Sequence, residues 1–163
     1  MRKELTEVIK TILPMPPVCT ADVMGSSKYP NLQGVLNFYP FWNGSLVIAE
    51  LWGLPSTGRI CEENVFGFHI HEGNSCTGNP DDPFADAGLH YNPGGCMHPH
   101  HAGDFPPLFE NDGYALTIFY TNRFEPEEVE GHCVIVHGMP DDFHTQPSGD
   151  SGMKIACGII KAS

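Results

Sequence analysis

Short strand-like runs separated by turn residues dominate this chain and constrain its fold more than any other feature. They occur at 18–25, 33–40, 44–53, 65–72, 114–121, 132–138 and 154–160. Each run is rich in β-branched or aromatic residues and is bounded by Gly, Pro, Asn or Asp. Because no long helical pattern separates them, the runs favour an antiparallel sandwich or barrel. The 18 Gly and 15 Pro among 163 residues fit a single domain with many turns.

The first 17 residues have a different pattern. Apolar residues recur at helical spacing from Leu5 to Leu13, and the pattern stops at Pro14, which predicts a short amphipathic helix. We therefore expect an N-terminal helical extension at 1–17 and one β domain at 18–163. Glu7 and Lys10 interrupt the apolar part, so the segment is a poor secretory signal and we expect a cytoplasmic protein.

The net charge of -12 argues against nucleic acid or an anionic membrane surface as a partner, because both require a basic face. The acidity is uneven, since no Lys or Arg occurs between Arg59 and Arg123. No apolar run is long enough to cross a bilayer. We expect neither a nucleic-acid nor a membrane partner.

Two long segments, 72–112 and 138–153, interrupt the rhythm of strands. They are rich in Gly, Asn, Asp and Pro, and the first of them contains four of the nine histidines. Loops of this length within a compact domain are usually functional or disordered. Because the segment 72–112 carries metal-ligand residue types, we expect it to be ordered by what it binds.

The sequence "FHIH" places two histidines on the run 65–72. Strand alternation puts Phe68 and Ile70 on one face, toward the core, and His69 and His71 together on the other. Imidazoles at this spacing on a strand can converge on one metal ion. In a chain with nine histidines the pair alone is also compatible with two exposed, solvated side chains.

A second cluster makes a metal site the stronger interpretation. It comprises His90, His98, His100, His101 and Asp104. Three imidazoles and one carboxylate form a closed tetrahedral set that suits Zn²⁺, and Cys96 is a competing ligand. A further candidate ligand, His137, closes the apolar run "CVIV".

The six cysteines are spread along the chain and contain no CxxC motif, which argues against a zinc ribbon or a thioredoxin-like site. Their even number permits disulfides without requiring them.

Taken in order, five motifs resemble the copper/zinc superoxide dismutase family, in particular its bacterial branch. They are "GFHIHE", "LHYNP", "HHAGD", "VIVHG" followed by "DD", and "KIACGII". The resemblance spans about residues 18–161. It implies an eight-stranded antiparallel Greek-key barrel with two long metal-carrying loops.

The resemblance also implies a ligand set for each metal. The copper ligands would be His69, His71, His90 and His137. The zinc ligands would be His90, His98, His101 and Asp104, with His90 shared between the metals. The offset from His90 favours His98 over His100, although the compressed "HPHH" keeps both as candidates.

Further roles follow from the same resemblance. Asp141 would orient one histidine of each site, and Cys76 and Cys157 would form a disulfide that ties the long loop to the last strand. Lys154 stands where the family usually has an arginine beside the copper channel. Lysine keeps the positive charge but loses the planar fork of the guanidinium group.

The resemblance implies an enzyme that converts superoxide to O₂ and H₂O₂ at a copper centre cycling between Cu(II) and Cu(I). His90 and Lys154 would be the catalytic side chains. The alternative is a non-catalytic member of the family that stores or delivers copper, which Lys154, the short 138–153 loop and the acidic surface would suit. Either function is compatible with a homodimer.

Overall fold

The fold is seen in a computed structural model that describes residues 14–59, 61 and 64–163. The helix expected at 1–17 falls almost wholly outside these residues. The strands are β1 (Cys19–Gly25), β2 (Gln33–Phe41), β3 (Gly44–Trp52), β4 (Val65–Phe66), β5 (Phe68–His71), β6 (Leu108–Phe109), β7 (Tyr114–Thr121), β8 (Cys133–His137) and β9 (Lys154–Ala162). All seven expected runs form strands, and the predicted all-β class is confirmed.

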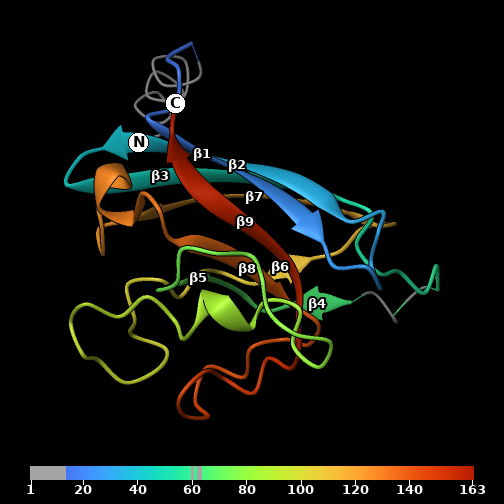
Figure 1. The fold of residues 1–163 in the computed structure, drawn as a ribbon. Helices are drawn as coiled ribbons and strands as arrows, with labels where there is room; N and C mark the ends of the chain where they lie inside the picture. The colour runs from blue at the N-terminus through green and yellow to red at the C-terminus, as the bar shows by residue number, and fades with distance from the viewer. Residues whose placement is uncertain (1–13, 60, 62–63) are drawn as a thin grey trace.

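One curled antiparallel sheet makes up most of the domain (Figure 1). Its strand order is β5-β8-β9-β1-β2-β3-β7, and a separate two-stranded ribbon pairs β4 with β6. Strands β4 and β5 come from the single run predicted at 65–72, which breaks at Gly67. There the amide of Gly67 donates to the carbonyl of Met139 at 2.8 Å, outside the main sheet.

The concave side of the sheet holds the main hydrophobic core. Alternate residues of the strands point into it, and Phe38, Leu51, Phe68 and Ile70 are fully buried there. Burying a side chain of this size stabilises the fold by about 1.5–3 kcal/mol. This core fixes the register of β5, since a shift by one residue would exchange its phenylalanine and histidine faces.

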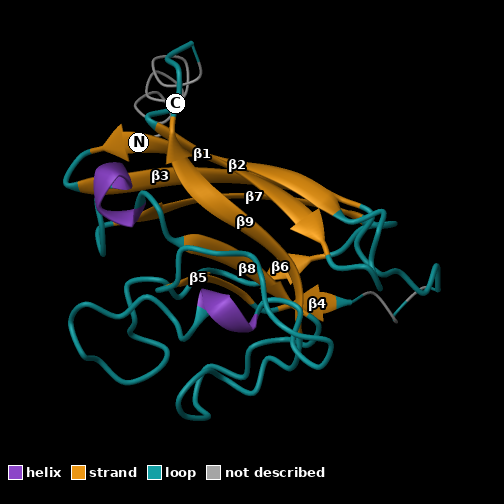
Figure 2. Cartoon of the chain, in the orientation of Figure 1, coloured by secondary structure: helices purple, strands orange, loops and turns teal. Residues whose placement is uncertain are grey.

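The two long loops gather beside β5 and β8, where Figure 2 shows them as extended teal segments below the sheet. A second, smaller core fastens the first loop to the sheet. Phe84 and Ala87 of the loop pack there against Cys133 and Ile135 of β8 and Cys157 of β9. This packing turns the outer face of β5 and β8 into a protein interior.

Helical structure in the described residues is limited to two short 3₁₀ turns, η1 (Ala85–Ala87) and η2 (Pro126–Val129). Each contributes a buried side chain, Ala87 and Val129 respectively. No helix within the described ranges has the length and apolar character needed to cross a bilayer.

Candidate metal centre

Strand β5 places His69 and His71 on the face opposite to Phe68 and Ile70. Both imidazoles are buried, with 0% and 2% of the residue exposed, because the long loops cover this face. The alternative of two solvated histidines is therefore excluded.

The first loop brings His90 to these histidines by running alongside β5. The amide of Tyr91 donates to the carbonyl of Ile70, and the amide of Ile70 donates to the carbonyl of Gly103, both at 2.8 Å. Gly103 is needed for this approach, since a Cβ at this position would lie 2.4 Å from the Ile70 carbonyl oxygen. The backbone pairing sets His90 opposite His71.

His137 reaches the same place from the end of β8. Its register with β9 shifts between Val136 and His137, so that His137 pairs with Lys154. Such an irregularity re-aims the side chain that follows it.

Four imidazoles thus converge from three separate segments. The candidate ligand atoms of His69, His71, His90 and His137 all lie within 4.8 Å of one another. The Nε2 atoms of His71 and His137 are 3.1 Å apart, and the ring centroids of His69 and His90 are 3.9 Å apart. We call these four residues the first group.

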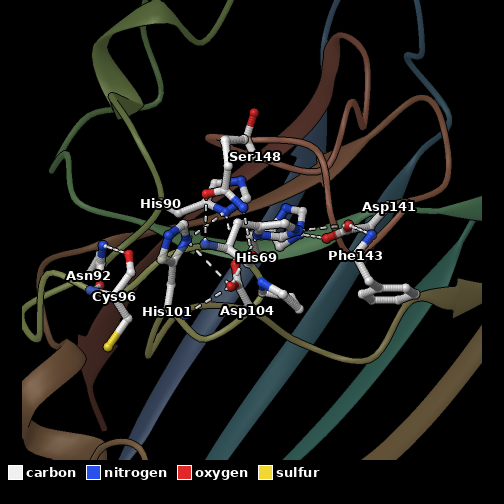
Figure 3. Close-up of polar contacts among 12 residues, drawn as sticks. His69, His90, Asn92, Cys96, His101, Asp104, Asp141, Phe143 and Ser148 are labelled. Carbon is white, nitrogen blue, oxygen red and sulfur yellow. Dashed lines mark hydrogen bonds and ion pairs between the residues drawn. The ribbon is translucent and has the colours of Figure 1, made fainter.

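A second group shares His90 with the first. It consists of His90, His98, His101 and Asp104, whose candidate ligand atoms also lie within 4.8 Å of one another. The Oδ1 of Asp104 lies 2.9 Å from His90 Nδ1, and its Oδ2 lies 3.2 Å from His98 Nδ1 (Figure 3 shows Asp104 beside His90 and His101). His100 is exposed and belongs to neither group.

The carboxylate of Asp141 joins the two groups (Figure 3). Its Oδ2 lies 2.7 Å from His69 Nε2, and its Oδ1 lies 2.9 Å from His98 Nε2. The amide of Phe143 also donates to Oδ1, at 2.7 Å. Burial alone would raise the pKa of Asp141, but these hydrogen bonds hold it well below its ordinary value. An ionised Asp141 accepts hydrogen bonds from the Nε2–H groups of His69 and His98. In the neutral rings the Nδ1 atoms then carry no proton.

Backbone carbonyls fix the other two tautomers. The Nδ1 of His71 donates to the carbonyl of Gly88 at 2.8 Å, and that of His137 donates to Gly152 at 3.2 Å. When both rings are neutral, each Nε2 then carries a lone pair and no proton. Two lone pairs facing each other at 3.1 Å form no hydrogen bond, whereas a cation between such atoms would satisfy both.

Further buried ring nitrogens have no hydrogen-bond partner among the described residues. They are His69 Nδ1, His90 Nε2 and His98 Nδ1. The Nδ1 of His90 faces the second group, so its unpaired Nε2 is the atom left for the first. Unpaired buried nitrogens are costly, and two metal ions would remove that cost. The residues present therefore fit a copper site and a zinc site.

Burial also keeps these imidazoles in the form that binds metal. It lowers the pKa of His69 to about 4, that of His137 to about 3, and that of His71 well below its ordinary value. For Asp104 burial would raise the pKa, but the hydrogen bond and charge of His90 lower it below the ordinary value. At neutral pH the rings are neutral and the carboxylate is ionised, as metal ligands must be.

Two side chains that carry no signal in the sequence, Gln146 and Arg123, hold the second group in place. Gln146 bonds the backbone of His98 twice, accepting from its amide at 3.0 Å and donating to its carbonyl at 2.7 Å. Arg123 donates to the carbonyl of His101 at 2.9 Å. Both act across more than 20 residues of chain, and no local motif marks them.

The predicted disulfide between Cys76 and Cys157 is present, with its Cα atoms 5.6 Å apart. It fastens the first loop to β9. Cys96, the competing ligand, is an exposed free thiol. Its amide and carbonyl bond the side chain of Asn92 in a turn that points away from both groups (Figure 3).

A pocket of about 450 Å³ opens onto the first group. His71, His90 and His137 line it, together with Lys154. The ammonium group of Lys154 forms an ion pair with Asp82 at 2.5 Å. Sequence reasoning selected Lys154 and missed its partner.

Comparison with known proteins agrees with this geometry. The family described as copper/zinc superoxide dismutase (SODC) matches residues 33–160. A "Superoxide dismutase [Cu-Zn]" of Deinococcus radiodurans is 32% identical over 90% of this chain and 85% of its own length. One of Haemophilus parainfluenzae is 34% identical over 72% of this chain and 73% of its own. The solved structure "Cu/Zn superoxide dismutase from Brucella abortus" superposes with a TM-score of 0.72 and 26% identity, covering 86% of this chain and 97% of that one. The chain belongs to the copper/zinc superoxide dismutase family.

Proposed function

We propose that this chain is an enzyme that dismutates superoxide, converting two superoxide anions and two protons into O₂ and H₂O₂. The observation that carries the proposal is the pair of buried ligand groups that meet at His90, with the pocket opening directly onto the first of them. The relatives named as copper/zinc superoxide dismutases come from several bacteria, and they support catalysis over copper storage or delivery.

In this proposal each group holds its own metal. Copper is held by His69, His71, His90 and His137. Zinc is held by His90, His98, His101 and Asp104. Bound in this way, copper supplies one-electron redox chemistry and zinc, which has none, fixes the geometry of the loop.

The chain itself contributes orientation, shielding and proton handling. The carbonyls of Gly88 and Gly152 and the carboxylate of Asp141 fix the tautomers of the imidazoles. His90 Nε2 is buried beside the pocket without a hydrogen-bond partner, so it is the atom at which the chain can hold and release a proton. Lys154 places a positive charge on the wall of the pocket that admits the anion.

The test is to measure the copper and zinc content per chain and the rate of superoxide removal on the same samples. We expect one copper and one zinc per chain and catalytic removal of superoxide. His137→Ala should abolish it, whereas His144→Ala, which alters an exposed histidine of the 138–153 loop, should not. His98→Ala should lower zinc content, while His100→Ala should leave it unchanged. Fully loaded protein without dismutation would refute the proposal.

A further inference from the structure

Lys154 occupies a defined position beside the first group. It is the first residue of β9 and the backbone partner of His137, and its side chain lines the same pocket as His71 and His90. Only 15% of this side chain is exposed. A cation held there is in a position to affect any anion that enters.

The pocket, however, is more acidic than basic. Among the described residues that line it, Lys154 is the only Lys or Arg, whereas Asp81 and Asp82 are both acidic. The Oδ2 of Asp82 contacts Lys154 Nζ at 2.5 Å, so the one cation is already paired. The sequence around these aspartates offers no compensation, because no Lys or Arg occurs between Arg59 and Arg123.

Asp82 is held in place by its own turn. The side chain of Asn79 accepts from the amides of Asp81 and Asp82, both at 3.0 Å, and the Asp82 carbonyl accepts from the amide of Asn79 at 2.9 Å. The Oδ1 of Asp82 accepts from the amide of Phe84 at 3.1 Å, which leaves Oδ2 for Lys154. The carboxylate is therefore presented to the lysine by the fold of the loop.

The disulfide holds this turn close to β9, the strand that carries Lys154. Cys157 lies on β9 three residues after Lys154, and Cys76 lies six residues before Asp82. The first loop is thus attached to β9 at two points, one covalent and one ionic. Phe84, two residues beyond Asp82, is buried in the small core that contains Cys157.

We propose that Asp82 is a positioning residue that restrains and neutralises Lys154, and thereby sets the affinity of the pocket for small anions. The proposal rests on the proposed function, because it takes the first group to hold copper at the base of the pocket. Removing the negative charge of Asp82 frees the ammonium group and makes the pocket more positive. Anions then bind more tightly, and the effect weakens as salt screens the charges.

The test is a double-variant cycle on copper- and zinc-loaded protein, with azide as the anion and the absorption of bound Cu(II) as the readout. We expect Asp82→Asn to tighten azide binding about 3- to 10-fold at low ionic strength, the size expected for one unit charge a few ångströms from the anion in a partly solvated pocket. The gain should shrink at high salt. In the Lys154→Met variant, Asp82→Asn should increase the azide affinity by a factor at least about threefold smaller than in the native chain, because no ion pair remains to be broken.

Asp81→Asn is the matched control, since it removes the same charge from the same pocket and leaves the ion pair intact. We expect a clearly smaller gain from it than from Asp82→Asn. Equal gains from the two variants, or additive effects of the Asp82 and Lys154 substitutions, would overturn the proposal. Azide binding needs copper but no turnover. If the loaded protein does not dismutate superoxide, yet the Asp82 and Lys154 substitutions have non-additive effects on azide affinity, only the proposed function is refuted.

Discussion

Replacing Asp141 with asparagine should weaken metal binding, because this carboxylate fixes the tautomers of His69 and His98. The native carboxylate accepts a hydrogen bond from His69 Nε2 at 2.7 Å and another from His98 Nε2 at 2.9 Å. An asparagine side chain offers one accepting oxygen and one donating amide group. One of the two imidazoles must then either face a donor with its own N–H or move its proton to Nδ1, the atom that points to the metal site.

The magnitude follows from the bonds that are lost. A hydrogen bond to a charged group contributes about 1.5–3 kcal/mol, and Asp141→Asn removes at least one such bond. Each 1.4 kcal/mol corresponds to a factor of about ten, so one metal should bind about 10- to 100-fold more weakly. The amide of Phe143 can still donate to the remaining oxygen, so the backbone of the 138–153 loop should keep its conformation.

Competition titration against a chelator of known affinity measures this effect for copper and zinc separately. Asp142→Asn is the control, because it removes the same charge one residue further along the chain. The carboxylate of Asp142 accepts from the amides of His144 and Thr145 and contacts neither ligand group. If Asp141→Asn binds both metals as tightly as the control does, Asp141 does not set the tautomers that metal binding needs.

Three further predictions concern the loops and the apo protein. Replacing Cys76 and Cys157 with serine should lower the free energy of unfolding, measured by urea denaturation, by up to about 4.5 kcal/mol, the contribution of loop-closure entropy at 25 °C for a sequence separation of 81 residues. Gln146→Ala should weaken zinc binding about tenfold in chelator competition and leave copper affinity less affected, because two bonds to the backbone of His98 are lost; equal losses for both metals would contradict this. In metal-free protein the folded pKa of His69, about 4, lies below its unfolded value near 6.5, so the unfolded chain takes up more protons between these values. The melting temperature should therefore fall as the pH is lowered from about 6.5 to about 4, and an unchanged melting temperature over that window would show that the ring is not buried in its neutral form.

The strands could be predicted from the sequence because each carries a local signal. Alternation identified the core face of β5, and the turn residues bounded every long strand. The two-residue strand β6 could not be predicted, since a segment this short has no periodicity and forms only where the fold brings it beside β4. Strand β4 was part of the run predicted at 65–72, but its separation from β5 at Gly67 was not predicted. The N-terminal helix, the cytoplasmic location and the homodimer stay predictions.

The residues that gather into the two candidate ligand groups could be predicted from the order of their motifs, whereas the residues that hold them in place could not. Gln146 contacts His98 across 48 residues, and Asp82 contacts Lys154 across 72. Both are polar loop residues of common types, and nothing nearby in the sequence distinguishes them from their neighbours. Their roles depend on the tertiary fold. Of the ion pair between Asp82 and Lys154, the sequence alone indicated only Lys154.

We propose that the two candidate ligand groups form one centre joined by the imidazole of His90. Loading the first group with Cu(II) and the second with Co(II) tests it directly, because two paramagnetic ions on opposite nitrogens of one ring couple magnetically. The electron paramagnetic resonance signal of Cu(II) should fade in proportion to the cobalt bound, up to one cobalt per chain. A Cu(II) signal of full intensity with both metals bound would show that the two metals do not share His90.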